Sequence, residues 1–384
     1  MATEFNSCVA VAAHLVSRPR MPVTASLPGP NARLPSLDGW RAVAIMLVIL
    51  SHFTATKGFV PPWWWTPVFQ GSLGVRMFFV ISGFLITYLL LLEADRRGDA
   101  SLRAFYTRRA LRILPVYFLY LGVVATLVAV GLYTDTATTW IGSLTFTRNF
   151  TGRSDSLTGH YWSLSVEEQF YLIWPVTLVA LKLWRRPRLA AGILLIPVVF
   201  CPILRTGIVQ AHWPNQWVAR ALNVFSTAIY ADSLAVGCLG AFAYRACRGR
   251  LKTAASGPAL GVALAVFVLA AAIDGRSGVS GTGAILPLIS AIALLCAILV
   301  TVERPAGRIY WLLNARPVVW LGVLSYSLYV WQELFVSYSA GPKLSVSPVY
   351  DWRVWWMPAI ACACASYYAV ERPILRLKDR LRAS

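Results

Sequence analysis

The stretch GVRMFFVISGFLITYLLLL, residues 74–92, decides the fold class. It is 19 residues long and contains one charged side chain, Arg76. An α-helix of that length covers about 28 Å, close to the ~30 Å of hydrocarbon in a bilayer. Nine similar stretches accompany it, so that apolar segments lie at 40–56, 74–92, 113–132, 164–183, 190–208, 222–244, 257–273, 283–301, 317–338 and 354–371. Because helices satisfy their own backbone hydrogen bonds in lipid, the sequence predicts an all-α fold, a polytopic integral membrane helical bundle with about ten transmembrane helices.

The composition excludes other classes of protein. Hydrophobic residues make up 58% of the 384-residue chain and charged residues 13%, whereas soluble domains carry about a quarter charged residues. The net charge of +19 comes from short basic clusters between apolar stretches rather than from a continuous basic stripe. We therefore expect contact with membrane lipid and no binding of nucleic acid. The seven cysteines are odd in number and lie mostly in or beside apolar stretches, so neither disulfides nor a metal site are expected.

The distribution of basic residues predicts the topology. Of the 35 lysines and arginines, 25 lie in the terminal segments and in alternate loops, eight lie on the opposite side, and two lie at helix edges. The positive-inside rule then places both termini in the cytoplasm of a multi-pass protein of the plasma (inner) membrane. Residues 1–33 are interpreted as a flexible cytoplasmic tail and residues 34–384 as the transmembrane domain. Met1 and Met21 are both possible starts.

The first apolar stretch, LDGWRAVAIMLVILSHF (37–53), carries two ionisable residues on one helix face. Arg41 and His52 are eleven positions apart, which brings them to nearly the same angle with a rise of about 16 Å. In a purely structural interpretation, Arg41 extends its charged end toward the membrane surface and His52 forms a hydrogen bond inside the bundle. Ionisable groups inside membranes are energetically costly, which favours a functional role. His52 is the only one of the four histidines expected inside a membrane segment; His160 is expected in an outer loop.

Other polar residues lie in three stretches. In residues 74–92, Ser82 and Gly83 favour close packing between helices. For Arg76, a structural role and a functional role are both possible. The cytoplasmic loop FYTRRALRILPVY (105–117) places Arg108, Arg109 and Arg112 together, with Arg108 and Arg112 on one helix face. Guanidinium groups match phosphate geometry, although membrane anchoring explains such a cluster equally well.

Acidic residues near membrane segments have two interpretations. Glu167 and Glu168 in HYWSLSVEEQFYLIWP (160–175) suit either a helix N-terminus or a carboxylate that orients a substrate or a histidine. Asp232, in YADSLAVGCLGAFAYR (230–245), suits a hydrogen bond or ion pair between helices.

Seven stretches occur in the order typical of one family: LDGWRAVAIMLVILSH, GVRMFFVISGFLITYLL, FYTRRALRILPVY, HYWSLSVEEQFYLIWP, YADSLAVGCLG, LGVLSYSLYVW and the closing VERP. Together they span about residues 35–375 and resemble the successive signatures of membrane-bound acyltransferase family 3. The resemblance implies an enzyme, a transmembrane acyltransferase domain over residues 34–384. It implies transfer of an acyl group, most often acetyl, from cytosolic acyl-CoA (acetyl-CoA) to a hydroxyl. The acceptor would be a carbohydrate or glycolipid: a surface polysaccharide, the O-antigen of lipopolysaccharide or a lipid-linked sugar. A small secondary metabolite such as a macrolide is the alternative.

The resemblance also implies roles for individual residues. It places His52, Arg41 and Glu167 in the catalytic site, Arg108, Arg109 and Arg112 at the acyl-CoA, and Glu371 as a final acid. This chain has Gln332 where many members have histidine, so that position lacks a titratable group. Some members carry a hydrolase domain after the last helix; because this sequence stops at Ser384, we expect transfer within one domain.

A mechanism follows from the expected depth of these groups. The CoA phosphates would meet the arginines, the pantetheine arm would run along a polar seam, and the thioester would arrive near His52. His52 would act as a general base or accept the acyl group first, and the sequence leaves both open. The acceptor would enter from the outer side near Glu167, with a cytosolic acceptor as the alternative. A transporter or flippase is the rival class, although no internal repeat is present. The acceptor, the acyl chain and the oligomeric state are not decided.

Overall fold

The computed structural model describes residues 34–56, 58–65, 69–151, 156–205, 230–277, 284–336 and 351–376. The expected tail over residues 1–33 lies outside these ranges. Within them every regular element is a helix and no β-strand occurs, so the predicted all-α class is confirmed.

Each of the ten apolar stretches overlaps a helix. The α-helices are α2 (Leu37–His52), α4 (Gly71–Arg97), α5 (Leu102–Ala129), α6 (Ala137–Leu144), α7 (Tyr161–Ala180), α8 (Pro187–Arg205), α11 (Ala231–Ala254), α12 (Gly257–Ser277), α13 (Leu286–Glu303), α14 (Arg308–Leu313), α15 (Arg316–Val336) and α17 (Trp356–Ser366). Short 3₁₀ turns occupy Phe53–Ala55, Arg148–Phe150 and Leu183–Arg185, and α17 continues into a π-helical turn, η7 (Tyr367–Glu371).

Five of the described helices are long and apolar enough to cross a membrane: α4, α5, α8, α12 and α13. Their outer surfaces suit lipid, since large apolar side chains are exposed on α8 and α12, among them Ile196, Val199, Val268 and Leu269. These helices support a multi-pass membrane protein. The expected number of about ten spans is not confirmed, because the other described helices are either shorter than 18 residues, as α2 is with 16, or too polar overall, as α7, α11 and α15 are.

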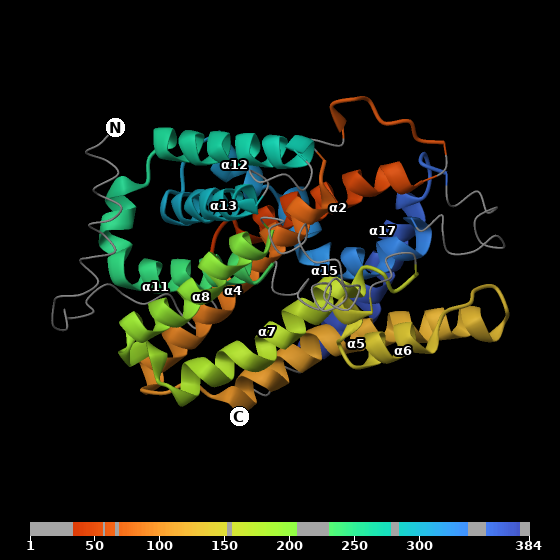
Figure 1. Ribbon diagram of the computed structural model, residues 1–384, viewed down its shortest axis with the longest axis horizontal. Helices are drawn as coiled ribbons and strands as arrows, with labels where there is room; N and C mark the ends of the chain where they lie inside the picture. Colours follow the sequence, from red (N-terminus) through yellow and green to blue (C-terminus); the bar gives the residue numbers. More distant parts are fainter. Residues whose placement is uncertain are drawn as a thin grey trace.

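The helices are arranged around a central row. In that row α17 packs on α15, α15 on α2, α2 on α4, and α4 on α11. Figure 1 shows α12 and α13 along one edge of the molecule and α5, α6 and α7 along the opposite edge. One hydrophobic core joins α4, α11 and α13, and a second joins α5, α7 and α15. The site described below lies where α2, α4, α5, α7 and α15 face one another.

The contact between α4 and α11 depends on two glycines. A Cβ atom on Gly83 would lie 2.1 Å from the carbonyl oxygen of Leu234, and a Cβ atom on Gly237 would lie 2.2 Å from that of Val80. Real side chains do not reach such distances, so the two backbones touch directly. The packing interpretation of Gly83 is therefore confirmed.

Candidate active site

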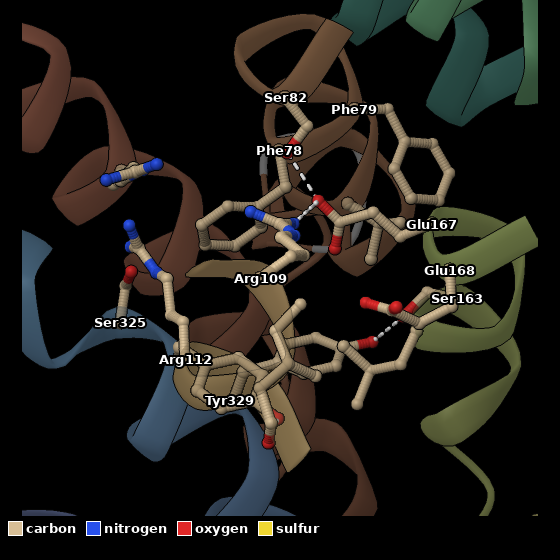
Figure 2. Close-up of a pocket in the computed structure, with 15 residues that line it drawn as sticks. Phe78, Phe79, Ser82, Arg109, Arg112, Ser163, Glu167, Glu168, Ser325 and Tyr329 are labelled. Atoms are coloured by element: carbon tan, nitrogen blue, oxygen red, sulfur yellow. Dashed lines mark hydrogen bonds and ion pairs between the residues drawn. The ribbon is translucent and has the colours of Figure 1, made fainter. Parts of the chain in front are cut away.

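A cavity of about 70 Å³ lies between five helices of the bundle (Figure 2). Its aromatic wall includes Phe78 and Phe79 of α4. Its polar lining comes from α2, α4, α5, α7 and α15, and consists of Arg41, Ser82, Arg109, Arg112, Ser163, Glu167, Glu168, Ser325, Tyr326 and Tyr329. Three arginines and two glutamates thus surround one space, which suits a ligand with several negative charges.

The turn between α4 and α5 determines where two of these arginines lie. Gly98 ends α4 with a φ of 80°, a left-handed conformation that glycine adopts without strain. Ser101 then caps α5, because its hydroxyl accepts a hydrogen bond from the backbone N–H of Ala104. The basic stretch expected as a cytoplasmic loop is therefore the first turns of a helix. An apolar pattern marks the lipid-buried part of a helix and misses an amphipathic start such as this one.

The start of α5 separates the three arginines of that stretch. Arg109 and Arg112, one turn apart, both line the cavity. Arg108 instead forms an ion pair at 3.3 Å with Glu93 near the end of α4 and does not contribute to the lining. Arg108 and Arg112 are four positions apart on α5, as the predicted shared face requires, but it is Arg109 and Arg112 that line the cavity.

Glu167 is the centre of a hydrogen-bonded cluster. Its Oε1 atom accepts hydrogen bonds from the Ser82 hydroxyl and from the phenol of Tyr171. The Nη2 atom of Arg109 lies 3.6 Å from the same oxygen, as Figure 2 shows, and the guanidinium of Arg109 lies 3.5 Å from the centre of the Tyr171 ring. The carboxylate and the aromatic face together fix Arg109 against the wall of the cavity.

The other two arginines are held less completely. Arg41 lies 3.3 Å from Asp38, one turn earlier on α2. Arg112 makes no hydrogen bond or ion pair with any residue in the described ranges, and the positive charges of Arg41 and Arg109 act on it. Arg112 thus lies close to two other cations and forms no ion pair with a described residue, which favours an anion in the cavity.

His52 lies outside this lining, at the last position of α2. Its Nδ1 atom is 3.2 Å from Oε1 of Gln332 on α15. The rise of an α-helix places it about 16 Å from Arg41. The cavity therefore brings together Arg41, Arg109, Arg112 and Glu167 of the predicted residues but does not include His52 or Arg108.

His160 lies in the turn that precedes α7, which agrees with the expected loop position, and it is buried there with only 5% of its surface exposed. Its ring packs at 5.4 to 5.6 Å from the rings of Tyr120 and Tyr329. Burial lowers the pKa of His160 well below its usual value, and the nearby charge of His52 lowers it further. His160 is therefore a neutral, buried neighbour of His52. The aromatic residues that surround it give no local pattern that would have revealed this burial.

Several residues at the site were missed from the sequence or given another role, among them Ser82, Tyr171 and Tyr329. Ser82 was assigned to packing, yet its hydroxyl faces the cavity and binds Glu167. Tyr171 lies one helical turn after Glu167, a spacing that places both on one face and could have identified it. Tyr329, whose hydroxyl is hydrogen-bonded with Ser163, carries a signal in its i+3 spacing from Tyr326.

The remaining acidic and basic predictions fall outside the cavity. Asp232 forms an ion pair at 2.8 Å with Arg205, which confirms the interhelical interpretation. Arg76 pairs with Asp274 at 2.9 Å, a structural role. Glu371 accepts a hydrogen bond from Ser327. Within the described ranges no group of three or more His, Cys, Asp or Glu side chains lies close enough to hold a metal ion.

Comparison with known proteins adds independent findings. The family model described as an acyltransferase domain matches residues 34–370. The peptidoglycan O-acetyltransferase OatA of Listeria monocytogenes is 27% identical over 373 residues, which cover 89% of this chain and 56% of that protein. The putative peptidoglycan O-acetyltransferase YrhL of Bacillus subtilis is 29% identical over 380 residues, covering 89% and 55%. A putative O-acetyltransferase of Staphylococcus aureus is 28% identical over 368 residues, covering 88% and 57%. The chain thus spans little more than half the length of these relatives, and no solved structure matches it.

Proposed function

The chain belongs to the acyltransferase domain family whose model matches residues 34–370, and from this premise we propose that it is a membrane O-acyltransferase. It moves an acyl group, acetyl in the simplest case, from acyl-CoA to a hydroxyl group of a carbohydrate. Three relatives named as established or putative O-acetyltransferases support the transfer of acetyl to oxygen. Two of those names specify peptidoglycan, which supports a glycan of the cell surface as the acceptor.

The donor would bind in the arginine-lined cavity. Acyl-CoA carries its phosphates at one end of a long pantetheine arm and its thioester at the other. Arg41, Arg109 and Arg112 offer guanidinium groups to the phosphates, and Arg112 forms no ion pair with a described residue. Phosphate binding would relieve the repulsion among these cations, so the ligand supplies the charges that the lining lacks.

The chemistry would take place at His52. The acceptor oxygen attacks the thioester carbon while the imidazole takes the hydroxyl proton, and the C–S bond then breaks. The CoA thiolate leaves and receives that proton, which restores the neutral histidine. The pantetheine arm would cover the about 16 Å between Arg41 and His52. Transfer through an acyl-histidine uses the same residue and the same donor.

Glu167 would support the donor side of this site. Because it binds Arg109, Ser82 and Tyr171 at once, it holds the wall against which the CoA lies. We propose that the domain crosses the plasma membrane about ten times with both termini in the cytoplasm. The donor then enters from the cytoplasm, and the glycan acceptor reaches His52 from the outer side.

The single observation that carries the proposal is a cavity in which three arginines converge and one of them, Arg112, forms no ion pair with a described residue. The test is transfer of labelled acetyl from acetyl-CoA to soluble glycan fragments by the full chain, purified in detergent. His52→Ala and His52→Gln should each lose about 10²–10⁴-fold in single-turnover rate, because neither side chain can accept a proton. Both variants should still bind acetyl-CoA.

A matched control is Arg245→Gln, since Arg245 pairs with Asp95 and does not line the cavity. It should bind acetyl-CoA and turn over as the native protein does. Near-native transfer by His52→Gln would mean that the base lies elsewhere. Unchanged affinity for acetyl-CoA in Arg109→Gln and Arg112→Gln would show that CoA does not bind in the cavity.

A further inference from the structure

The contact between His52 and Gln332 defines the protonation of the imidazole ring. Gln332 comes from α15, is 0% exposed, and places Oε1 at 3.2 Å from Nδ1 of His52. A carbonyl oxygen only accepts hydrogen bonds, so Nδ1 must carry the proton. In a neutral imidazole the other ring nitrogen, Nε2, is then unprotonated and free to accept one.

The rest of the Gln332 side chain has no other use within the described ranges. Its amide nitrogen is buried and lacks a hydrogen-bond partner there. Buried amides in folded proteins normally satisfy both ends, and a residue that does not is retained for something other than stability. The only side-chain hydrogen bond that Gln332 makes among the described residues is the one to His52.

The neutral charge of Gln332 also matters. A carboxylate at this place would stabilise the protonated imidazole, whereas an amide orients the ring without adding charge. Two further titratable groups lie nearby. One is His160, which interacts electrostatically with His52 when His52 is protonated, and the other is Glu333, the next residue on α15. Glu333 makes no hydrogen bond or ion pair with a described residue, and Gln332 is the side chain hydrogen-bonded to His52.

We infer that Gln332 is a positioning residue for the proposed catalytic base: it selects the His52 tautomer with the proton on Nδ1 and directs Nε2 toward the acceptor hydroxyl. The inference rests on the proposed function of His52. Nε2 takes the proton of the hydroxyl as its oxygen bonds to the thioester carbon, and returns that proton to the departing CoA thiolate. Through this cycle the Nδ1–H bond to Gln332 stays in place.

The test compares two substitutions with a matched control. Gln332→Met keeps the size and removes the acceptor oxygen, so kcat should fall about 10–100-fold while KM for acetyl-CoA is unchanged, because only the base loses its orientation. Gln332→Glu keeps an acceptor oxygen. It should retain more turnover than Gln332→Met and move the acid limb of the pH–rate profile to higher pH.

Gln169→Met is the control, since the Gln169 amide donates to Phe146 and Asn149 and not to His52. It should keep native kcat and pH dependence. His160→Asn should leave the shift caused by Gln332→Glu in place, which assigns the shift to His52. Native kcat in Gln332→Met would overturn the inference. So would equal loss in Gln332→Met and Gln332→Glu, or a loss in Gln169→Met as large as in Gln332→Met.

A measurement on the unsubstituted protein tests the inference even if the variants do not fold. Nitrogen NMR of histidine-labelled protein, with the His52 signals assigned by their loss in His52→Gln, should show a protonated Nδ1 and an unprotonated Nε2. The opposite tautomer would overturn the inference. Failure of the proposed function is distinguishable, because His52→Gln would then remain active. If His52→Gln is inactive and Gln332→Met is native, only the role of Gln332 fails.

Discussion

Arginine meets carboxylate in two buried regions of this bundle, and the two regions are built differently. Between α8 and α11, Arg205 and Asp232 face each other through two contacts of 2.8 Å, with their side chains 7% and 0% exposed. Asp232 also accepts a hydrogen bond from the backbone N–H of Ser233. Around the cavity, by contrast, Arg109 shares Glu167 with two hydroxyl groups, and Arg112 has no acid partner in the described ranges.

This difference indicates that the Arg205–Asp232 pair stabilises the fold, whereas the arginines around the cavity bind a ligand. A buried charge that is matched one to one needs nothing further, and its removal harms folding. Around the cavity, one cation among three forms no ion pair with a described residue, so a bound anion could supply that contact. Substitutions in the matched pair should therefore lower stability, whereas substitutions in the cavity should mainly weaken ligand binding. The two effects can be measured separately.

The largest expected effect is on the matched pair. Asp232→Ala leaves the Arg205 charge buried and alone, which should lower the free energy of unfolding by about 3–5 kcal/mol. Thermal unfolding in detergent measures this loss. The double variant Arg205→Met/Asp232→Leu should recover most of it, since no charge is then left unpaired. A native melting temperature for Asp232→Ala would show that the two regions do not differ in this way.

Next in size is Glu167→Gln, which removes the charge that holds Arg109 while keeping the shape of the side chain. Hydrogen bonds to a charged group contribute about 1.5–3 kcal/mol, so kcat/KM for transfer should fall about 10–100-fold. The melting temperature should fall less than for Asp232→Ala, because the cavity admits water. Steady-state kinetics with varied acetyl-CoA gives the value, and an unfolding defect as large as that of Asp232→Ala would make Glu167 architectural.

A smaller effect is expected from Arg112→Gln. The dissociation constant for acetyl-CoA should rise about tenfold, or about 1.4 kcal/mol, and the change should shrink at high salt. The free protein should unfold at the same temperature or slightly higher, since a like charge next to Arg41 and Arg109 is gone. Equilibrium binding and unfolding without ligand measure the two quantities. A clear loss of stability would show that Arg112 stabilises the fold, as the matched Arg205–Asp232 pair does.

Arg108→Gln should have the smallest effect. Arg108 pairs with Glu93 beside the protein surface and outside the lining, and such pairs contribute about 0–1 kcal/mol. The dissociation constant for acetyl-CoA should change by less than about fivefold, in the same titration used for Arg112→Gln. An effect as large as that of Arg112→Gln would return Arg108 to the donor site, as the sequence first indicated.

The sequence could predict the helices because apolar length reports burial in lipid directly. It misplaced the start of α5, since Leu102 to Arg112 form a helix whose polar side chains break the apolar pattern. It also could not pair Arg109 with Glu167, because no local spacing relates α5 to α7. The residues beside Glu167 were within reach only where a helical turn connects them, as with Tyr171.

The glycine contact between α4 and α11 has a mechanical consequence. Because backbone touches backbone at Gly83 and Gly237, no side-chain rotamer can adjust to absorb sliding, and the two helices must move as one rigid body. Helices α5 and α7 contact their neighbours at fewer points, and they form the other wall of the cavity. Of the helices that line the cavity, α4 is therefore the one that direct backbone contact with α11 holds in place.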